Sequence, residues 1–318
     1  MNIVLLEDLA VPASVMEDWK AKLNEQGHTL HIYNKTSDAA LLQEECKEAD
    51  AIILANMPLP WSAIEQADKL KFIDVAFTGT DHVPVKEASE KGIVISNASG
   101  YATESVAELC IAFAIELLRK LPALETAGKE GKTKAGLRGR LVHGKTVGIV
   151  GTGHIGTRTA EYFKALGAHV IGCNHSGKDN PVFDEMVSLE DLLKRSDLVS
   201  LHTPLTDSTR HLIGAEQLSL MKHSAFLINT ARGAVVDTDA LSEALKKGTI
   251  AGAALDVYDK EPPLPKDCPF FETPNTLMTP HMGFDSEESM QIRAEIVFDN
   301  LQNWLAGHPL NVVNAAAK

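Results

Sequence analysis

Three polar side chains stand where short apolar runs end in the second half of the chain, and each could take part in chemistry. They are Arg232 in INTARGAVVD, Glu261 in LDVYDKEPP and His281 in MTPHMGF. Arginine offers a rigid fork that binds a carboxylate at two points, and histidine transfers protons near neutral pH, helped by a carboxylate that holds its ring. Together they could form an acid beside a carboxylate anchor. Taken singly, Arg232 could be a surface arginine, Glu261 a solvated loop glutamate and His281 a histidine that caps a turn.

A glycine-rich turn joins a strand-like run to a helix-like run within TVGIVGTGHIGTRTAEYFKALGAHVIGCN, residues 146–174. β-branched residues at 147–150 predict a strand, apolar residues at 160, 163 and 166 predict a helix, and a second strand begins near His169. Gly151 permits a tight turn, Gly153 lets the backbone approach a pyrophosphate, and Gly156 lets the helix lie close on its strand. The order predicts a dinucleotide site; alternatively, the glycines serve only the turn.

Composition narrows the range of partners. A chain of 318 residues predicts two domains, and a formal charge of −13 with only 30 Lys plus Arg argues against nucleic acid or anionic membranes as partners. No apolar stretch approaches the length of a membrane span, and no signal peptide is evident. The four cysteines are far apart and form no CxxC, which favours buried free thiols over disulfides or a metal site. We therefore expect a cytoplasmic protein that acts on small molecules.

The pattern of apolar residues predicts two α/β domains. In the first part of the chain, expected strands at 3–6, 30–33, 52–54, 72–77 and 93–95 alternate with expected helices at 16–23, 39–46, 64–67 and 85–90. A long helix at 103–119 leads to the second domain, and residues 129–144 read as a surface excursion. Further pairs follow at 189–202, 218–229 and 241–257, then a strand at 276–279 and a helix at 286–305 placed back on the first domain. The loops at 56–60 and 77–82 follow strands, where ligands of open α/β sheets bind, although ordinary turns explain them equally well.

The sequence resembles the D-isomer-specific 2-hydroxyacid dehydrogenases, which include glycerate, phosphoglycerate, lactate and glyoxylate or hydroxypyruvate enzymes. The matching motifs span nearly the whole chain: FTGTDHV (77–83), YATESVAEL (101–109), GKTVGIVGTGHIG (144–156), DLVSLHTPLTDSTRHLI (197–213), LINTARGAVVD (227–237), ALDVYDKEPP (254–263) and TPHMGF (279–284). The resemblance implies two doubly wound parallel-sheet domains. One is a discontinuous flavodoxin-like substrate domain at 1–98 and 285–318, and the other is a Rossmann domain for NAD or NADP at 99–284.

The resemblance also assigns residue roles. His281 would protonate the substrate carbonyl, Glu261 would partner His281, and Arg232 would anchor the substrate. Backbone amides near Phe77, Thr78 and Gly79 would hold the substrate carboxylate. The implied cofactor contacts are Thr78, Thr103, His154, Ile155, Thr203, Pro204, Thr230, Ala231, Arg232, Asp256 near the nicotinamide carboxamide, His281 and Gly283, besides the three glycines of the turn.

One position departs from the family. Members that prefer NAD usually have an aspartate where the strand after the glycine turn ends, whereas this chain has Asn174, followed by His175 and Ser176. A carboxylate there binds the ribose hydroxyls and repels a 2′-phosphate, and a neutral asparagine with neighbouring donors removes that repulsion. The choice between NAD and NADP therefore stays open.

The residues of the site bear on several candidate functions. The leading hypothesis is a reductase of small 2-keto acids. Tyr101 and Thr103 resemble the subgroup of the family that acts on glycerate or hydroxypyruvate. A dinucleotide-sensing protein without activity, such as the corepressors among the family's relatives, would be favoured if Arg232, Glu261 or His281 were missing. Formate or phosphite oxidation is a minor alternative, and phosphoryl transfer lacks a GxxxxGK[ST] loop. The resemblance further implies a homodimer formed through the second domain, with the 103–119 helix contributing.

Overall fold

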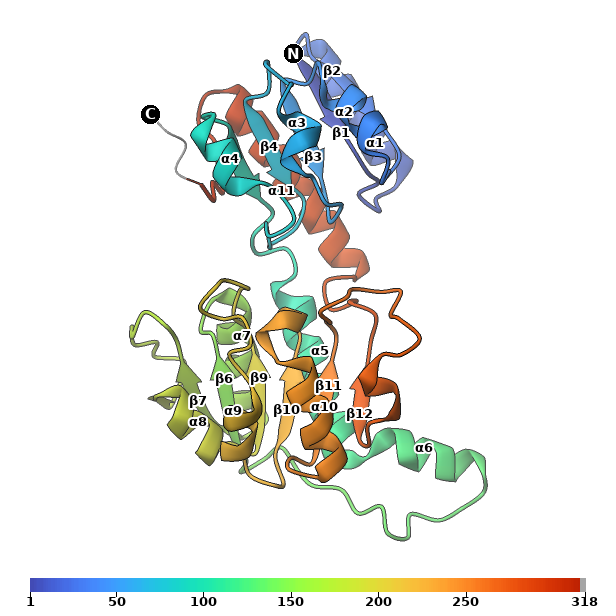
Figure 1. The fold of residues 1–318 in the computed structure, drawn as a ribbon, viewed down its shortest axis with the longest axis vertical. Helices are drawn as coiled ribbons and strands as arrows, with labels where there is room; N and C mark the ends of the chain where they lie inside the picture. Colours follow the sequence, from blue (N-terminus) through green and yellow to red (C-terminus); the bar gives the residue numbers. More distant parts are fainter. Residues whose placement is uncertain (315–318) are drawn as a thin grey trace. The chain divides into compact units, whose positions relative to one another are not determined.

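The structure is a computed structural model that describes residues 1–314 and divides into two compact units (Figure 1). Unit 1 comprises Met1–Ala102 together with the segment from Asp285 onward, and unit 2 comprises Thr103–Phe284. The sequence had placed the first domain boundary after residue 98, whereas the division by packing falls after residue 102. The second boundary is the same, after residue 284.

Unit 1 is built on a five-stranded parallel sheet in the order β2-β1-β3-β4-β5. Its elements are β1 (Asn2–Leu5), α1 (Ala13–Glu25), β2 (Thr29–Ile32), α2 (Ala39–Cys46), β3 (Ala51–Leu54), α3 (Trp61–Ile64), β4 (Phe72–Val75), α4 (Val85–Glu90), β5 (Val94–Asn97) and α11 (Glu287–Leu305). All four residues of β3 and of β4 are buried, as expected for central parallel strands covered on both faces.

The helix α11 belongs to unit 1, although unit 2 precedes it in the sequence. Its Trp304 ring stacks on Phe72 of β4 with ring centroids 4.8 Å apart. The Asn300 side-chain amide donates to the Asp74 carboxyl at 3.1 Å and to the Asn97 carbonyl at 3.0 Å. Burial raises the pKa of Asp74 well above its usual range. The predicted return of this helix to the first domain is confirmed.

Unit 2 is built on a seven-stranded parallel sheet in the order β12-β11-β10-β9-β6-β7-β8. Its elements are α5 (Thr103–Arg119), α6 (Leu121–Lys129), β6 (Thr146–Val150), α7 (His154–Ala165), β7 (His169–Cys173), β8 (Glu185–Met186), α8 (Leu189–Arg195), β9 (Leu198–Leu201), α9 (Ala215–Leu220), β10 (Phe226–Asn229), the 3₁₀ turn η1 (Gly233–Val235), α10 (Thr238–Lys247), β11 (Gly252–Leu255), the 3₁₀ turn η2 (Pro269–Glu272) and β12 (Thr276–Met278). The two parallel-sheet domains that the sequence predicted are confirmed.

Some local predictions were wrong. The short helix expected at 64–67 lies at Trp61–Ile64, because Pro60 at its N-cap starts the helix earlier. Leu166, expected on the apolar face of α7, is the residue that closes that helix and is 39% exposed. Neither α6 nor β8 was predicted from the sequence. In α6 only Ala127 is buried and β8 has two residues, so neither leaves a clear apolar period.

The expected free cysteines are confirmed: Cys46, Cys110 and Cys268 are buried thiols, and Cys173 is partly buried. Burial raises the pKa of Cys110 to about 11 and of Cys46 to about 12, so both thiols stay protonated near neutral pH. Between residues 1 and 314, no helix has the length and apolar character needed to cross a membrane.

Candidate active site

The carboxyl ends of five parallel strands meet at one edge of the unit 2 sheet. Val150 of β6 pairs with Leu201 of β9, Leu201 with Asn229 of β10, Asn229 with Leu255 of β11, and Leu255 with Met278 of β12. Ligands of open parallel sheets bind beyond such an edge. The predicted site residues that follow these strand ends are Gly151, Gly153, Thr203, Pro204, Thr230, Ala231, Arg232, Asp256, Glu261, His281 and Gly283.

Two of the three glycines are required by the chain itself. Gly151 has φ +99°, and a Cβ there would lie 2.5 Å from the His202 carbonyl oxygen. A Cβ on Gly156 would lie 2.0 Å from the Gly151 carbonyl oxygen, so α7 is seated directly on the turn. A Cβ on Gly153 would meet no protein atom within 4 Å. The protein itself would therefore accommodate a side chain at Gly153. A glycine at such a position is expected where a ligand lies close to the backbone.

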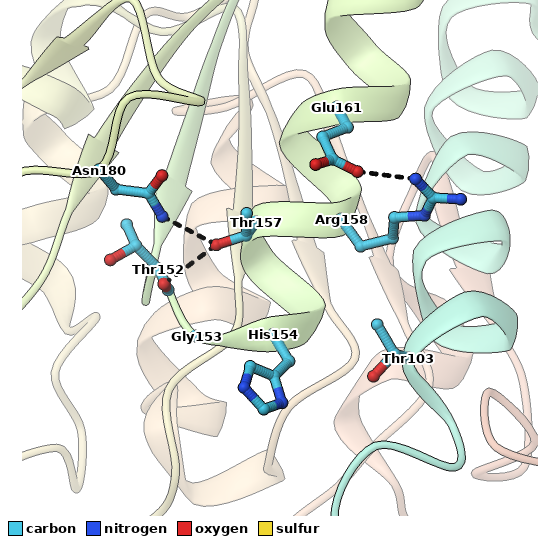
Figure 2. A pocket seen from close by; sticks show the side chains of 8 residues that line it. All are labelled: Thr103, Thr152, Gly153, His154, Thr157, Arg158, Glu161 and Asn180. Carbon is cyan, nitrogen blue, oxygen red and sulfur yellow. Dashed lines mark hydrogen bonds and ion pairs between the residues drawn. The ribbon is translucent and has the colours of Figure 1, made fainter.

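A cavity of about 440 Å³ opens at the N-terminus of α7 (Figure 2). The helix begins after Gly153, which provides no side-chain cap, so its first N–H groups and the positive end of its dipole are available to an anion. Predicted residues in the lining are Thr103, Gly153 and His154, and residues that the sequence analysis missed are Thr152, Thr157, Arg158, Glu161 and Asn180. Thr157 and Arg158 are polar residues about one helical turn after Gly153, and this spacing was the available signal for them.

Polar contacts fix this lining. The Asn180 amide donates to the Thr157 hydroxyl at 3.0 Å, and that hydroxyl donates to the Thr152 carbonyl at 3.1 Å. Arg158 lies between two carboxylates, with Nε 2.9 Å from Glu104 and Nη1 2.7 Å from Glu161. The guanidinium is thus already neutralised, and the helix N-terminus remains the main source of positive potential for a phosphate.

Thr203, a predicted cofactor contact, carries a buried hydroxyl that has no hydrogen-bond partner within the described chain. A buried hydroxyl without a partner costs free energy, and a bound ligand would satisfy it. Its neighbour His202 is hydrogen-bonded to the Ser200 hydroxyl at 2.9 Å, and burial lowers the pKa of His202 to about 3. The residues of this edge therefore fit a dinucleotide.

The end of β7 holds the three residues predicted to read the adenosine ribose. The Asn174 amide donates to the Thr152 hydroxyl and to the Lys178 carbonyl, both at 2.9 Å, and the Ser176 hydroxyl donates to Asn174 Oδ1 at 3.1 Å. The Asn174 and Ser176 side chains therefore hydrogen-bond to each other. Lys178 is an exposed cation on the same turn that the sequence analysis passed over.

His281 and Glu261 lie in direct contact, as predicted. Nδ1 of the imidazole is 2.9 Å from Oε2 of the carboxylate, across 20 residues of sequence. The His281 ring also contacts Phe284 edge-on, with ring centroids 5.6 Å apart. With Nδ1 held by a carboxylate, the imidazole orientation is fixed and Nε2 is the nitrogen that can serve a ligand.

Asp256 holds the segment that carries His281. Its carboxylate accepts hydrogen bonds from the Thr279 hydroxyl at 2.5 Å, the Met282 N–H at 2.9 Å and the Gly283 N–H at 2.8 Å. Asp256 is 1% exposed, and a Cβ on Gly283 would lie 2.9 Å from its carboxylate. Sequence reasoning assigned Asp256 to the nicotinamide carboxamide, and its role in anchoring the 279–283 segment was missed.

Arg232 lies on a backbone that is fixed on both sides. The Asn229 amide donates to the Arg232 carbonyl at 3.0 Å, and Arg232 Nη1 donates to the Ala231 carbonyl at 2.8 Å. A Cβ on Gly233 would lie 1.9 Å from the backbone of Tyr258, so this turn packs directly against the β11 loop. Behind it, the Thr230 hydroxyl and the Cys110 thiol are 3.3 Å apart.

The predicted substrate loop of unit 1 is also held by hydrogen bonds. The Asn97 amide donates to the Thr78 carbonyl at 2.6 Å, the Ala98 N–H donates to the Phe77 carbonyl at 3.1 Å, and a His82 ring nitrogen is 2.8 Å from the Ala55 carbonyl. Phe77 is buried, whereas Thr78 is exposed. The loop therefore has an ordered backbone with its tip open to solvent.

Comparisons with known proteins show the family to which the chain belongs. The family model described as "D-isomer specific 2-hydroxyacid dehydrogenase, NAD binding domain" matches residues 111–283. A glyoxylate reductase of Korarchaeum cryptofilum is 39% identical over 281 residues, which cover 85% of this chain and 84% of that protein. A D-3-phosphoglycerate dehydrogenase of Methanocaldococcus jannaschii is 38% identical over 280 residues, which cover 86% of this chain and 53% of that protein. The chain thus spans about half the length of the second relative.

Solved structures are similar along the whole chain. An acyclic imino acid reductase in complex with NADPH and D-Arg has a TM-score of 0.91 at 28% identity, covering 98% of this chain and 100% of that one. The D-lactate dehydrogenase from Aquifex aeolicus complexed with NAD and lactic acid has a TM-score of 0.89 at 28% identity, covering 100% of both chains. With the matched nucleotide-binding domain and relatives above 30% identity over most of the chain, this protein belongs to the D-isomer-specific 2-hydroxyacid dehydrogenases, a family of NAD(P)-dependent oxidoreductases.

Proposed function

We propose that this dehydrogenase reduces a small 2-keto acid to the D-2-hydroxy acid, with His281 as the proton donor. The observation that carries the proposal is the 2.9 Å contact between His281 and Glu261 at the ligand-binding edge of the sheet. NAD(P)H, when bound, supplies a hydride to the carbonyl carbon. His281 supplies the proton to the carbonyl oxygen, and Glu261 stabilises the imidazolium before the transfer. The products are the hydroxy acid and NAD(P)⁺.

Arg232 is proposed to anchor the substrate carboxylate through its planar fork, assisted by backbone N–H groups at Phe77, Thr78 and Gly79. Support for Arg232 comes from its position after β10 and from the hydrogen bonds that fix its backbone. Relatives named glyoxylate reductase and glycerate dehydrogenase support a substrate of two or three carbons. We therefore propose glyoxylate or hydroxypyruvate as the first substrates to test.

The cofactor preference is proposed to be dual or modestly toward NADPH. Asn174 lacks the charge that would repel a 2′-phosphate, and His175, Ser176 and Lys178 lie on the adjoining turn. The similar structures include one bound to NADPH and one bound to NAD, so the fold accommodates both.

We further propose a cytoplasmic homodimer formed through α5 and the segment that follows it. The exposed apolar side chains Ile115 (36%), Leu121 (40%) and Leu141 (65%) support this surface. The Arg140 N–H donates to the Leu118 carbonyl at 2.8 Å, which brings the 139–141 strip against the end of α5. A second copy of the chain would cover these side chains.

A panel experiment tests the function. Oxidation of NADH and of NADPH is followed at 340 nm with glyoxylate, hydroxypyruvate, pyruvate, oxaloacetate and branched 2-keto acids, and the product configuration is determined by chiral chromatography. Turnover of at least one keto acid to the D-isomer supports the proposal. Tight NAD(P)H binding without turnover of any keto acid would favour the dinucleotide-sensing alternative, and turnover confined to formate or phosphite with NAD(P)⁺ would move the function to oxidation of those anions.

A further inference from the structure

A buried arginine lies beneath the predicted substrate loop of unit 1. Arg293 is on α11, and only 3% of its surface is exposed. Burial lowers the pKa of Arg293 from its usual value, and its Nε has no hydrogen-bond partner within residues 1–314. A buried charge with an unsatisfied donor is costly, so a role that outweighs this cost is expected.

The guanidinium contacts three loops that follow three different strands. Its Nη2 donates to the carbonyl of Leu9, after β1. It lies 5.6 Å from the ring centroid of Phe77, after β4, and 5.8 Å from that of Tyr101, after β5. Tyr101 is also a hydrogen-bond partner of Arg293, and the two rings pack edge to face with centroids 6.0 Å apart.

These contacts fix the backbone that the proposed function uses. Phe77 begins the segment whose amides are proposed to hold the substrate carboxylate, and Tyr101 leads into α5. A cation–π contact is stronger when the cation is shielded from water, and two rings share this buried cation. The cation therefore ties Phe77 and Tyr101 to each other and to the β1 loop. Since the guanidinium itself is buried, it acts on a substrate through these rings.

We propose that Arg293 is a positioning residue that holds the Phe77–Gly79 segment in the conformation that binds the substrate carboxylate. This inference rests on the proposed function, and it adds a residue on α11 that lies outside every motif of the family resemblance. Arg293 and the residues it contacts, Leu9, Phe77 and Tyr101, all belong to unit 1, and none of them is among the predicted cofactor contacts.

The experiment compares four variants of the full chain. Arg293→Met keeps the volume and removes the charge, Arg293→Lys keeps a charge without the fork, and Tyr101→Phe keeps the ring without the hydroxyl. Lys22→Met is the matched control, because the exposed Lys22 side chain also lies over an aromatic ring, 5.6 Å from the centroid of Phe298 on α11. Each variant is measured by hydrogen–deuterium exchange without ligands, by keto-acid KM and kcat, and by NAD(P)H affinity from fluorescence.

In Arg293→Met we expect the peptide at 76–83 to exchange about tenfold faster and the keto-acid KM to rise about tenfold or more, as the loss of a contact of about 1.4 kcal/mol or more gives. NAD(P)H affinity and exchange in unit 2 should match those of the wild type. Arg293→Lys should recover part of the loss, Tyr101→Phe should show a smaller loss, and Lys22→Met should show none.

Unchanged exchange at 76–83 together with an unchanged KM in Arg293→Met would overturn the proposal, as would equal losses of keto-acid and NAD(P)H binding. If Arg293→Met does not fold, the same comparison is made with Arg293→Lys and Tyr101→Phe, and wild-type behaviour of both would overturn it. A wild type that turns over no keto acid defeats the proposed function alone, because the exchange measurement on the ligand-free protein still decides whether Arg293 orders this loop.

Discussion

His281 has a backbone φ of +59°, in the left-handed region that side chains rarely adopt. Such a conformation costs about 1 kcal/mol or more and persists where the surroundings enforce it, and the three hydrogen bonds to Asp256 do so here. The imidazole is thus held from the backbone side by Asp256 and from the ring side by Glu261. A strained backbone at a candidate catalytic residue supports a role for that residue in the chemistry.

For His281→Ala we expect kcat with the best keto acid to fall by about 10² to 10⁴, the contribution of a general acid. NAD(P)H affinity should persist, since the ring is proposed to serve the substrate. His211→Ala is the control, because His211 has a similar φ of +52° and an exposed side chain. A fall of less than threefold in kcat for His281→Ala would show that another group delivers the proton.

Arg232→Ala should raise the keto-acid KM and lower kcat as well, because the fork both binds the carboxylate and orients the carbonyl. Arg232→Lys should recover only part of the activity, since an ammonium lacks the two-point geometry. Steady-state kinetics on both variants decide the matter, with Arg195→Ala, an exposed arginine paired to Glu185, as control. Wild-type kinetics in Arg232→Lys would contradict the assignment.

Asn174→Asp should move the ratio of kcat/KM toward NADH by about tenfold or more, the effect of one charge contact of about 1.4 kcal/mol. The new carboxylate would accept from the ribose hydroxyls and repel a 2′-phosphate. Measurement of both cofactors in wild type and variant tests this. If the wild type already favours NADH a hundredfold and Asn174→Asp does not change the ratio of kcat/KM values, another residue recognises the ribose.

At the scale of elements, the loop after β12 is shaped by the carboxylate at the end of β11. In Asp256→Asn, an NH₂ group replaces one of the two oxygens that accept these hydrogen bonds. At least one buried donor then has no acceptor, which costs about 1–3 kcal/mol of stability. We expect a lower melting temperature and a fall of about tenfold in kcat as the His281 segment loses its anchor.

Asp197→Asn is the matched control for this loop. Asp197 accepts from the Thr146 N–H at 3.0 Å, at the opposite edge of the same sheet. The Asp197→Asn variant should have a lower melting temperature, whereas its kcat per folded molecule should equal that of the wild type. If the two variants lose stability and activity in the same proportion, the Asp256 anchor is structural and has no special link to His281.

Elements with a strong apolar period were predictable from the sequence. The 17-residue helix α5 buries seven residues at helical spacing, and its predicted bounds are the observed ones. The His281–Glu261 pair was predictable because both residues follow strands of one parallel sheet and lie in motifs that the family resemblance pairs. The anchoring by Asp256 was not, since its three partners lie 23 to 27 residues away and two of them donate through backbone N–H groups that almost any residue carries. Arg293 likewise left no signal, because arginine on a helix ordinarily predicts an exposed face.

At the scale of the whole molecule, the proposed homodimer has a direct test. A monomer has a mass of 34.4 kDa, so light scattering after size-exclusion chromatography should give about twice that value. The double variant Leu121→Glu/Leu141→Glu places charges on the exposed apolar strip and should shift the protein toward the monomer. Leu310→Glu, at an exposed apolar residue of unit 1, is the control. A wild type that elutes as a monomer would rule out this assembly.

The discontinuity of unit 1 has a consequence for biosynthesis. The partners of Phe72, Asp74 and the Leu9 carbonyl lie on α11. This helix leaves the ribosome only after the 182 residues of unit 2, from Thr103 to Phe284. Unit 2 is continuous and can complete its own sheet during translation. The five strands translated first therefore stay without their α11 partners until the end of synthesis, and the part of the enzyme proposed to recognise the substrate is the last to mature.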